Sequence, residues 1–312
     1  MTMPVLEVEG LSISFTQYDK GVRQRSLPVI RDLDLTIRPG QVVAVVGSSG
    51  SGKSLLAHGI LGILPYNARQ SGSIRYRGEP LTPRRAEELR GREIVLIPQS
   101  VGYLDPLMQV GPQIRKGRRD LASRARSREI LGRYHLGSEV EALYPFELSG
   151  GMTRRVLIST AVVEAPSLVI ADEPTPGLDP RSLHHIMDHF REIADSGAGL
   201  LLITHDLEAA LAIADRVAVF YAGETIEEAP ALDFAAEETL RHPYTRALWR
   251  AMPQHGFQPI PGAQPYPGAA RQGCPFLPRC PRRTAECGSA VPYRPVEGGF
   301  VRCLHPERGA GA

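Results

Sequence analysis

The segment that most constrains the fold is a glycine-rich loop directly behind a buried strand. Residues 47–54 read Gly-Ser-Ser-Gly-Ser-Gly-Lys-Ser and follow the apolar run 42–46. Strand, loop and helix start in this order form the P-loop pattern, whose backbone N–H groups cradle phosphate. Glycine permits this close approach because it has no Cβ. We therefore predict that the loop binds a nucleoside triphosphate through Gly47, Ser48, Ser49, Gly50, Ser51, Gly52, Lys53 and Ser54.

Further short motifs follow the P-loop in a fixed order. They are Gln99, the loop of Leu148, Ser149, Gly150, Gly151 and Met152, the pair Asp172-Glu173, the turn 177–179, and His205. This ordered set resembles the ATP-binding cassette (ABC) ATPases, with their Walker A, Q-loop, signature, Walker B, D-loop and switch-histidine motifs. The resemblance implies that the chain binds and hydrolyses ATP.

The same resemblance implies roles at the catalytic centre. Asp172 would reach the Mg²⁺ held by Ser54, and Glu173 would accept a hydrogen bond from the attacking water. His205 would donate to the γ-phosphate or to the water, and Gln99 would sense Mg²⁺ and the γ-phosphate. The catalytic residues are thus Glu173, His205 and Gln99, and the Mg²⁺ ligands are Ser54, Gln99 and Asp172.

The signature loop, residues 148–152, implies a dimer. In the ABC family, Ser149 and Gly151 contact the γ-phosphate bound by the opposite subunit. Met152 stands where many ABC proteins have Gln, and resembles the peptide-importer branch. The D-loop region departs from the family at Pro176-Gly177; because Pro fixes φ and removes a donor, we expect a stiffer loop.

An aromatic residue before the P-loop usually stacks on adenine in this family. Phe15 is the candidate, with Tyr18 close behind it in the sequence. A core position for Phe15 is an equal alternative.

Periodicity predicts an α/β fold. Alternating segments predict antiparallel strands, and later apolar strands separated by helical segments predict a parallel sheet with polar groups at its carboxyl ends. The antiparallel segments are 6–8, 11–15 and 33–37, and the later strands are 168–171, 200–204 and 217–221. With the resemblance, we expect an ABC-type P-loop ATPase core with an antiparallel β subdomain, a helical subdomain at about 100–160 and a small cysteine-containing tail.

Composition changes after about residue 252. Residues 1–252 are assigned to the ABC ATPase domain, the proline-rich stretch 253–272 to an extended linker and 273–312 to the tail. Residues 242–248, His-Pro-Tyr-Thr-Arg-Ala-Leu, and the tail resemble the C-terminal region of oligopeptide/dipeptide/nickel-type importer ATPases.

The tail holds all four cysteines of the chain, which are Cys274, Cys280, Cys287 and Cys303. In a cytoplasmic protein, disulfides are not expected. Four thiolates suit a [4Fe–4S] cluster or zinc, although the spacing is not that of a zinc ribbon. Some relatives carry an iron–sulfur cluster here. A cluster, zinc and no metal all stay open.

Two other groups of residues have plainer interpretations. We expect His184, His185 and His189 to lie on a solvated helix face, because no carboxylate-rich pocket is implied. The arginine-rich stretch 115–133 could suggest nucleic acid, but it falls in the expected helical subdomain and is read as solvated. The net charge of only +2 agrees with no nucleic-acid partner.

The expected location is the cytoplasmic face of the inner or plasma membrane, peripherally bound, because neither a membrane-spanning segment nor a signal peptide is evident. The implied partners are a second homologous ABC ATPase forming a heterodimer, two integral-membrane permeases and an extracytoplasmic substrate-binding protein. Residues 99–113 are candidates for contact with a permease.

The sequence therefore predicts an ATPase subunit powering a peptide importer. The same machinery importing nickel or a metal chelate is the alternative. A non-transport ABC ATPase acting on DNA or ribosomes is a distant one, because residues 53–148 contain no heptad run.

Overall fold

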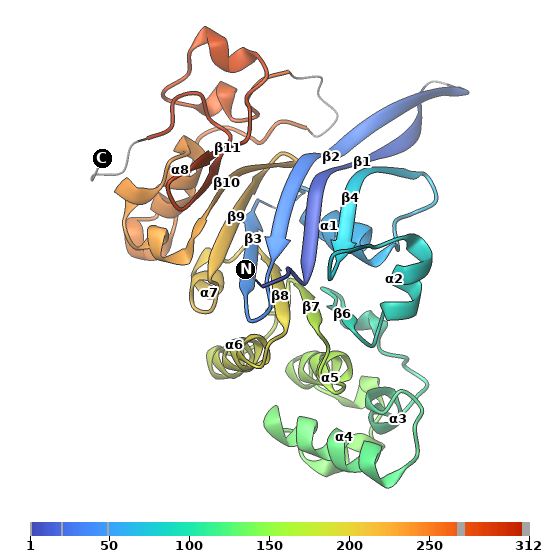
Figure 1. The fold of residues 1–312 in the computed structure, drawn as a ribbon. Coiled ribbons are helices and arrows are strands. Elements are labelled where there is room, and N and C mark those ends of the chain that lie inside the picture. The colour runs from blue at the N-terminus through green and yellow to red at the C-terminus, as the bar shows by residue number, and fades with distance from the viewer. Residues whose placement is uncertain (1, 20, 49, 267–271, 308–312) are drawn as a thin grey trace.

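Two β-sheets organise the molecule, a computed structural model that describes residues 2–19, 21–48, 50–266 and 272–307 (Figure 1). The larger sheet has strand order β11-β12-β10-β9-β3-β8-β7-β6. Its β6–β7–β8–β3–β9 part is parallel, and the strands beyond β9 pair antiparallel. The strands are β3 Val42–Gly47, β6 Ile94–Ile97, β7 Leu168–Asp172, β8 Gly199–Thr204, β9 Arg216–Tyr221, β10 Glu224–Pro230, β11 Arg294–Val296 and β12 Gly299–Val301.

The smaller sheet is antiparallel, as the alternating segments predict. Its order is β2-β1-β4-β5, and its strands are β1 Leu6–Asp19, β2 Arg23–Ile37, β4 Ala68–Tyr76 and β5 Glu79–Pro80. The two expected strands at 6–8 and 11–15 are one strand, interrupted by a register shift between Val8 and Leu11. Gly10, within the shift, has φ 58°, a conformation that glycine adopts without strain.

Strand β3 separates two hydrophobic cores. Val42, Ala44 and Val46 face one core, and Val43 and Val45 face the other, as the two-residue period of a strand requires. The first core is covered by α5 Gly150–Val162, α6 Pro180–Asp195, α7 Leu207–Leu211 and α8 Pro243–Arg250. The second core holds α1 Lys53–Leu61 between the two sheets, with α2 Pro83–Leu89 against α1. The P-loop is thereby anchored on both sides.

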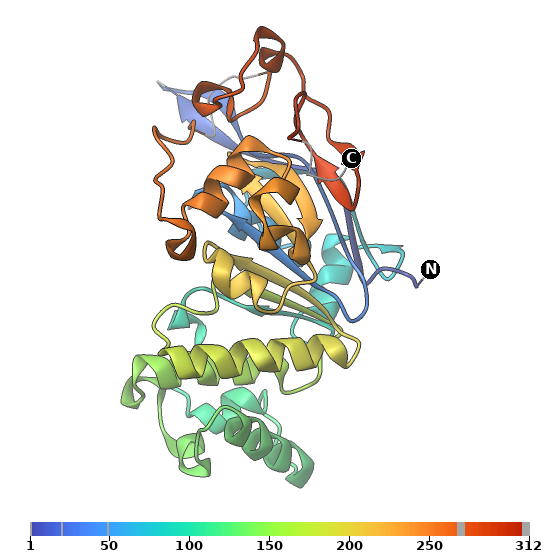
Figure 2. The ribbon, with the colours of Figure 1, turned by 90° about the vertical axis from the view of Figure 1, so that its left-hand side faces the viewer.

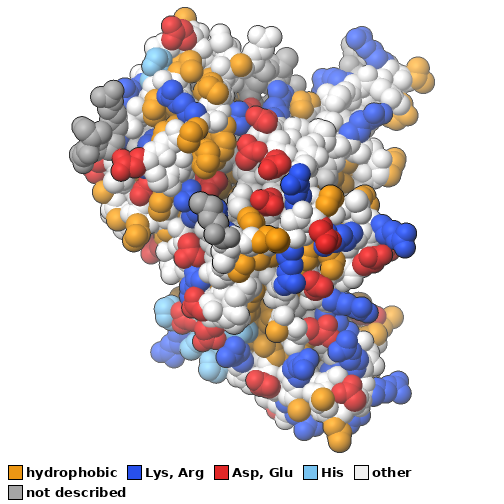
Figure 3. All heavy atoms as spheres, viewed as in Figure 1, with side chains coloured by type: hydrophobic (Ala, Val, Ile, Leu, Met, Phe, Trp, Pro, Cys, Tyr) orange, Lys and Arg blue, Asp and Glu red, His pale blue; other side chains and the backbone are white. Residues whose placement is uncertain are grey.

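A helical subdomain lies at one end of the molecule (Figure 2). It contains α3 Val110–Ile114, α4 Leu121–Arg133 and part of α5, around a core of its own. Lys and Arg side chains gather on its surface (Figure 3). Most arginines of 115–133 are exposed as expected; Arg115 instead is largely buried and pairs with Glu141 at 2.9 Å.

The cysteine-containing tail joins the larger sheet, which the sequence analysis did not predict. Strand β12 pairs with β10, and β11 with β12. Phe276 packs its ring against Tyr221 of β9 and Tyr244 of α8, with centroids 5.5 and 5.4 Å apart. No helix among the described residues is long and apolar enough to cross a membrane.

Candidate active site

The P-loop begins where β3 ends. A Cβ on Gly47 would lie 2.2 Å from the Phe220 carbonyl oxygen of the neighbouring strand, so only glycine fits there. Gly50 and Gly52 have φ of 76° and 99°, and Gly52 leads directly into α1. Ser49 lies outside the described residues. The backbone thus curls back at the carboxyl edge of the parallel sheet and presents the start of a helix.

Lys53 lies folded into this loop. Its Nζ donates to the carbonyl oxygens of Gly47 at 2.8 Å and Ser48 at 3.1 Å. An ammonium has three donors, so one is left to address an anion held in the loop. Burial lowers the pKa of Lys53, and the charges of Glu173 and Asp172 oppose part of that shift.

Asp172 and Ser54 make a site of oxygen atoms beside the loop. Asp172 ends β7 and is buried, and the Ser54 hydroxyl hydrogen-bonds to its carboxylate. Burial raises the pKa of Asp172, and its Oδ1 has no hydrogen-bond partner among the described residues. A buried carboxylate oxygen without a partner, next to a hydroxyl, fits Mg²⁺, which proteins bind through one or two carboxylates together with substrate phosphates.

Glu173 and His205 meet at the ends of two adjacent parallel strands. His205 Nδ1 lies 2.9 Å from both carboxylate oxygens of Glu173, and Thr204 Oγ1 lies 3.4 Å from Oε2. The backbone of Glu173 has φ 47°, an uncommon value for a residue with a side chain, and its N–H donates to the Ile203 carbonyl. The carboxylate is therefore held in one orientation at the mouth of the loop.

Gln99 joins these groups from the loop after β6. It lines a hollow of about 320 Å³. The other residues of that hollow are Val29, Gly50, Gly52, Lys53, Ser54, Leu55 and Glu173. The structure thus brings together P-loop, Q-loop and Walker B residues that are far apart in the sequence.

The signature loop lies apart from this hollow. Ser149 caps α5 and accepts a hydrogen bond from the Met152 N–H, at 3.4 Å. Ser149 and Gly150 are exposed, and a Cβ on Gly150 would meet no atom within 4 Å. Gly151 and the half-buried Leu148 and Met152 complete the loop. The surface it offers is open to an incoming group rather than to its own P-loop.

The unusual Pro176-Gly177 pair forms a turn. The Leu178 N–H donates to the Thr175 carbonyl at 3.2 Å, and Gly177 has φ 80°. Pro followed by Gly in the left-handed region is the signature of a type II turn. Asp179 then caps α6 by accepting hydrogen bonds from Arg181 and Ser182. The D-loop is held by a turn and a cap, and its expected stiffness stays a prediction.

The aromatic candidates lie away from the hollow. Phe15 is partly buried in β1 and packs against the second core. Tyr18 is 71% exposed and lines a separate hollow with Tyr66. The adenine-stacking role of Phe15 therefore stays a prediction.

The four cysteines meet in the tail. They line one cavity of about 20 Å³ with His242 and His305, and all four thiols are free. Among the described residues, however, no three His, Cys, Asp or Glu side chains are arranged to hold a metal ion. Burial raises the pKa of the Cys274 thiol to about 12. As described, this geometry does not fit a metal ion or cluster.

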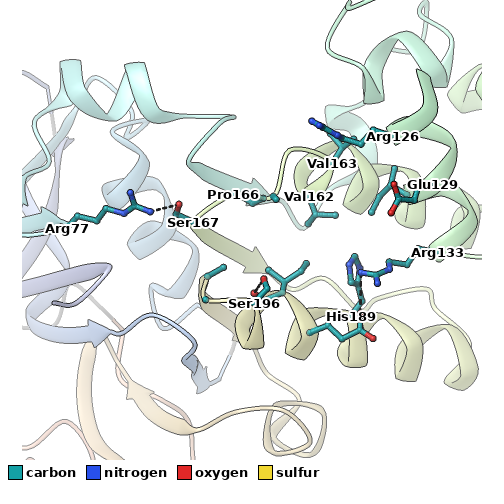
Figure 4. A pocket seen from close by; sticks show the side chains of 16 residues that line it. Arg77, Arg126, Glu129, Arg133, Val162, Val163, Pro166, Ser167, His189 and Ser196 are labelled. Atoms are coloured by element: carbon teal, nitrogen blue, oxygen red, sulfur yellow. Dashed lines mark hydrogen bonds and ion pairs between the residues drawn. The ribbon is translucent and has the colours of Figure 1, made fainter. Parts of the chain in front are cut away.

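A larger hollow, of about 710 Å³, lies elsewhere, between α4, α6 and the amino ends of β7 and β8 (Figure 4). Arg126, Glu129 and Arg133 point into it from α4.

His189 also lines this hollow, where it is buried and hydrogen-bonded to the Tyr134 hydroxyl. The prediction of a solvated face was wrong for His189, because α6 turns this side toward the helical subdomain; His184 and His185 are exposed.

Sequence analysis also missed Arg154, which binds the backbone of the Q-loop from α5. The only feature of the sequence that could have indicated this role is the position of Arg154, two residues after the signature loop. Gln264 was missed as well: it lies in the expected linker, yet hydrogen-bonds the Ser48 hydroxyl of the P-loop.

Comparison with known proteins agrees with this geometry. Residues 30–176 match the ABC transporter family, and 226–287 match the C-terminal region of oligopeptide/dipeptide transporters. A putative peptide import ATP-binding protein of Brucella abortus is 35% identical over 97% of this chain and 95% of its own. The oligopeptide transport ATP-binding protein of Salmonella typhimurium is 34% identical over 97% and 94%, respectively.

Solved structures agree on the fold. An ATP-binding subunit of an ABC transporter is 26% identical with TM-score 0.61, covering 74% of this chain and 91% of that one. A dimeric bacterial ABC transporter cassette, 22% identical, gives TM-score 0.63 over 72% of this chain and 98% of its own. The expected α/β fold of a P-loop ATPase is confirmed. The chain belongs to the ABC transporter family of ATP-binding proteins and is an ATPase with the C-terminal region of the oligopeptide/dipeptide branch.

Proposed function

We propose that this ATPase powers a membrane importer of peptides. The observation that carries the proposal is the match of residues 226–287 to the oligopeptide/dipeptide transporter region, together with two relatives named for peptide import or oligopeptide transport. The domain boundaries at about residues 252 and 272 belong to this proposal. The ATPase domain, 1–252, would do the chemistry, and the tail, 273–312, would mark the transporter branch.

The residues around the 320 Å³ hollow would divide the catalytic work. The loop N–H groups and Lys53 hold the phosphates, and Ser54, Asp172 and Gln99 hold Mg²⁺, which neutralises phosphate charge when bound. Glu173 accepts a proton or hydrogen bond from the attacking water. His205 Nδ1 lies 2.9 Å from the Glu173 carboxylate and holds that carboxylate in its orientation. Its other ring nitrogen would donate toward the γ-phosphate only from the imidazolium form, because a neutral imidazole has a single N–H donor.

The open signature loop supports a dimer of cassettes. Ser149 to Gly151 sit at the positive end of α5, where an anion is favoured, yet outside the hollow of their own chain. A second, homologous ATPase would present its bound γ-phosphate to this loop. We propose a heterodimer, because importers of this branch are expected to pair two related subunits.

An apolar groove supports a permease partner. It has a volume of about 330 Å³ between α5 and the loop after β6. Its lining residues are Leu96, Pro98, Tyr103, Leu104, Gln113, Lys116, Leu157 and Thr160. Nearby, Leu107 is 86% exposed although it is apolar. A short helix of one integral-membrane permease would insert here, at the cytoplasmic face of the membrane.

The test is reconstitution with permeases and a substrate-binding protein of the peptide-importer class, sought first among the genes that neighbour the one for this chain. We expect ATP hydrolysis in proteoliposomes to rise when the binding protein carries peptide. Stimulation only by a nickel- or chelate-loaded binding protein would instead support the metal alternative. No association with any permease would refute the transport proposal but leave the ATPase assignment intact.

The iron–sulfur cluster stays a separate prediction. Convergence of Cys274, Cys280, Cys287 and Cys303 on one cavity supports it, whereas their present arrangement does not fit a cluster. Anaerobic purification followed by iron analysis and visible absorption spectroscopy distinguishes a tail that holds a cluster from one that does not. A colourless, iron-free protein with full ATPase activity would remove the cluster.

A further inference from the structure

Arg154 connects two loops that the proposed mechanism uses separately. It lies in α5, one turn after the signature loop that begins this helix. Its side chain points to the end of β6, where Nη1 donates to the Pro98 carbonyl at 2.9 Å and Nη2 to the Gln99 carbonyl at 2.5 Å. The signature helix is thereby fastened to the backbone of the Q-loop.

The chemistry of this contact requires arginine. Arg154 is only 5% exposed, and among the described residues it has no ion pair with a carboxylate. Burial lowers the pKa of its guanidinium, so the two carbonyls are what offset the lost hydration. A planar guanidinium can donate to two adjacent carbonyls in one fixed orientation, whereas a lysine ammonium is a point charge without that fork.

The contact lies beside the groove that we assign to the permease. Pro98 lines that groove from the loop, and Leu157 and Thr160 line it from α5. A group inserted into the groove would therefore press on both of the segments that Arg154 holds together.

We propose that Arg154 is a positioning residue for ATP hydrolysis, which keeps the signature loop in register with Gln99. When Gln99 moves toward nucleotide in its own hollow, the guanidinium carries α5 and its exposed Ser149 with it. The nucleotide site of one subunit would thus set the position of its own signature loop, which contacts the nucleotide bound by the other subunit. The inference rests on the roles proposed above for Gln99 and the signature loop.

The test is a double-mutant cycle in the full chain within its transporter complex. Arg154→Lys should lower kcat for MgATP by about 10- to 100-fold, the effect of misplacing a catalytic group by about 1 Å. KM and the affinity for a fluorescent ADP analogue should stay within about twofold, because the P-loop is untouched. If Arg154 acts through Gln99, Gln99→Ala and the double variant should have the same kcat.

The matched control is Arg191→Lys. Arg191 also donates to backbone carbonyls, those of Gly40 and Ile213, but it lies away from the hollow. It should change the midpoint of thermal unfolding at least as much as Arg154→Lys while leaving kcat unchanged.

Three results would overturn the inference. The first is a wild-type kcat for Arg154→Lys together with a reduced kcat for Gln99→Ala. This result would refute the role of Arg154 and leave the catalytic role of Gln99 intact. Another is additive losses in the double variant, which would make Arg154 merely structural. The third is a wild-type kcat for Gln99→Ala, in which case the assignment of Gln99 fails first and the inference falls with it.

Discussion

At the scale of single residues, the Glu173 carboxylate is the most sensitive test of the catalytic proposal. Glu173→Gln keeps the size of the side chain and a donor or acceptor for His205, but removes the basic oxygen. We expect nucleotide binding to persist and turnover to fall by about 10²- to 10⁴-fold, the usual contribution of a general base. Phosphate release and equilibrium binding measure the two effects.

The control for this variant is Glu192→Gln, on the exposed side of α6. It should hydrolyse ATP like the native chain. Wild-type turnover by Glu173→Gln would take Glu173 out of the proposed role.

Residues inside contiguous motifs were predictable, and those that act across the fold were not. Lys53, Ser54, Asp172 and Glu173 follow from short patterns that fix the backbone around them. His189 was misjudged because its neighbour Tyr134 lies at the end of α4, 55 positions earlier in the chain. A helical wheel shows which side a residue is on, but not what will cover that side.

At the scale of elements, the parallel strands were predictable because each is a continuous apolar run. Strands β11 and β12 were not, since they have only three residues each and lie in a proline- and cysteine-rich stretch. Their pairing depends on the edge that β10 offers, and nothing local in the sequence signals such an edge.

The pairing of β12 makes a prediction at Gly299. A Cβ there would lie 1.9 Å from the Glu228 carbonyl oxygen of β10, so the strands cannot stay at their present distance. We expect Gly299→Ala to detach β11 and β12 and to speed amide exchange in residues 226–230 and 294–302. Hydrogen–deuterium exchange measures this. Gly288→Ala is the control, because a Cβ at Gly288 meets nothing within 4 Å; equal exchange in both variants would contradict the prediction.

At the scale of the whole molecule, two buried histidines predict an acid-sensitive fold. Burial lowers the pKa of His189 to about 4 and that of His242 to about 3. The unfolded chain binds these protons near pH 6.5, so stability is fully present above that value and falls as pH decreases toward the folded-state pKa values. In that window each histidine lowers the free energy of unfolding by about 1.4 kcal/mol for each unit by which the pH decreases.

Urea unfolding at pH 7.5, 6.5 and 5.5 measures this slope. His189→Gln should reduce it by about half, since one of two titrating groups is gone. His184→Gln, on the exposed face of the same helix, should leave it unchanged. A slope that is the same in all three proteins would rule out His189 as a contributor.

The strands contributed by the tail have a practical consequence for engineering. Because β12 completes the catalytic sheet and Phe276 packs on Tyr221 and Tyr244, the C-terminal region is not a detachable module. A chimera that grafts a foreign tail at the proline-rich junction would exchange part of the interior. Such a graft would succeed only if the donor's own β10 strand, and its residues at the positions of Tyr221 and Tyr244, were transferred together with its tail.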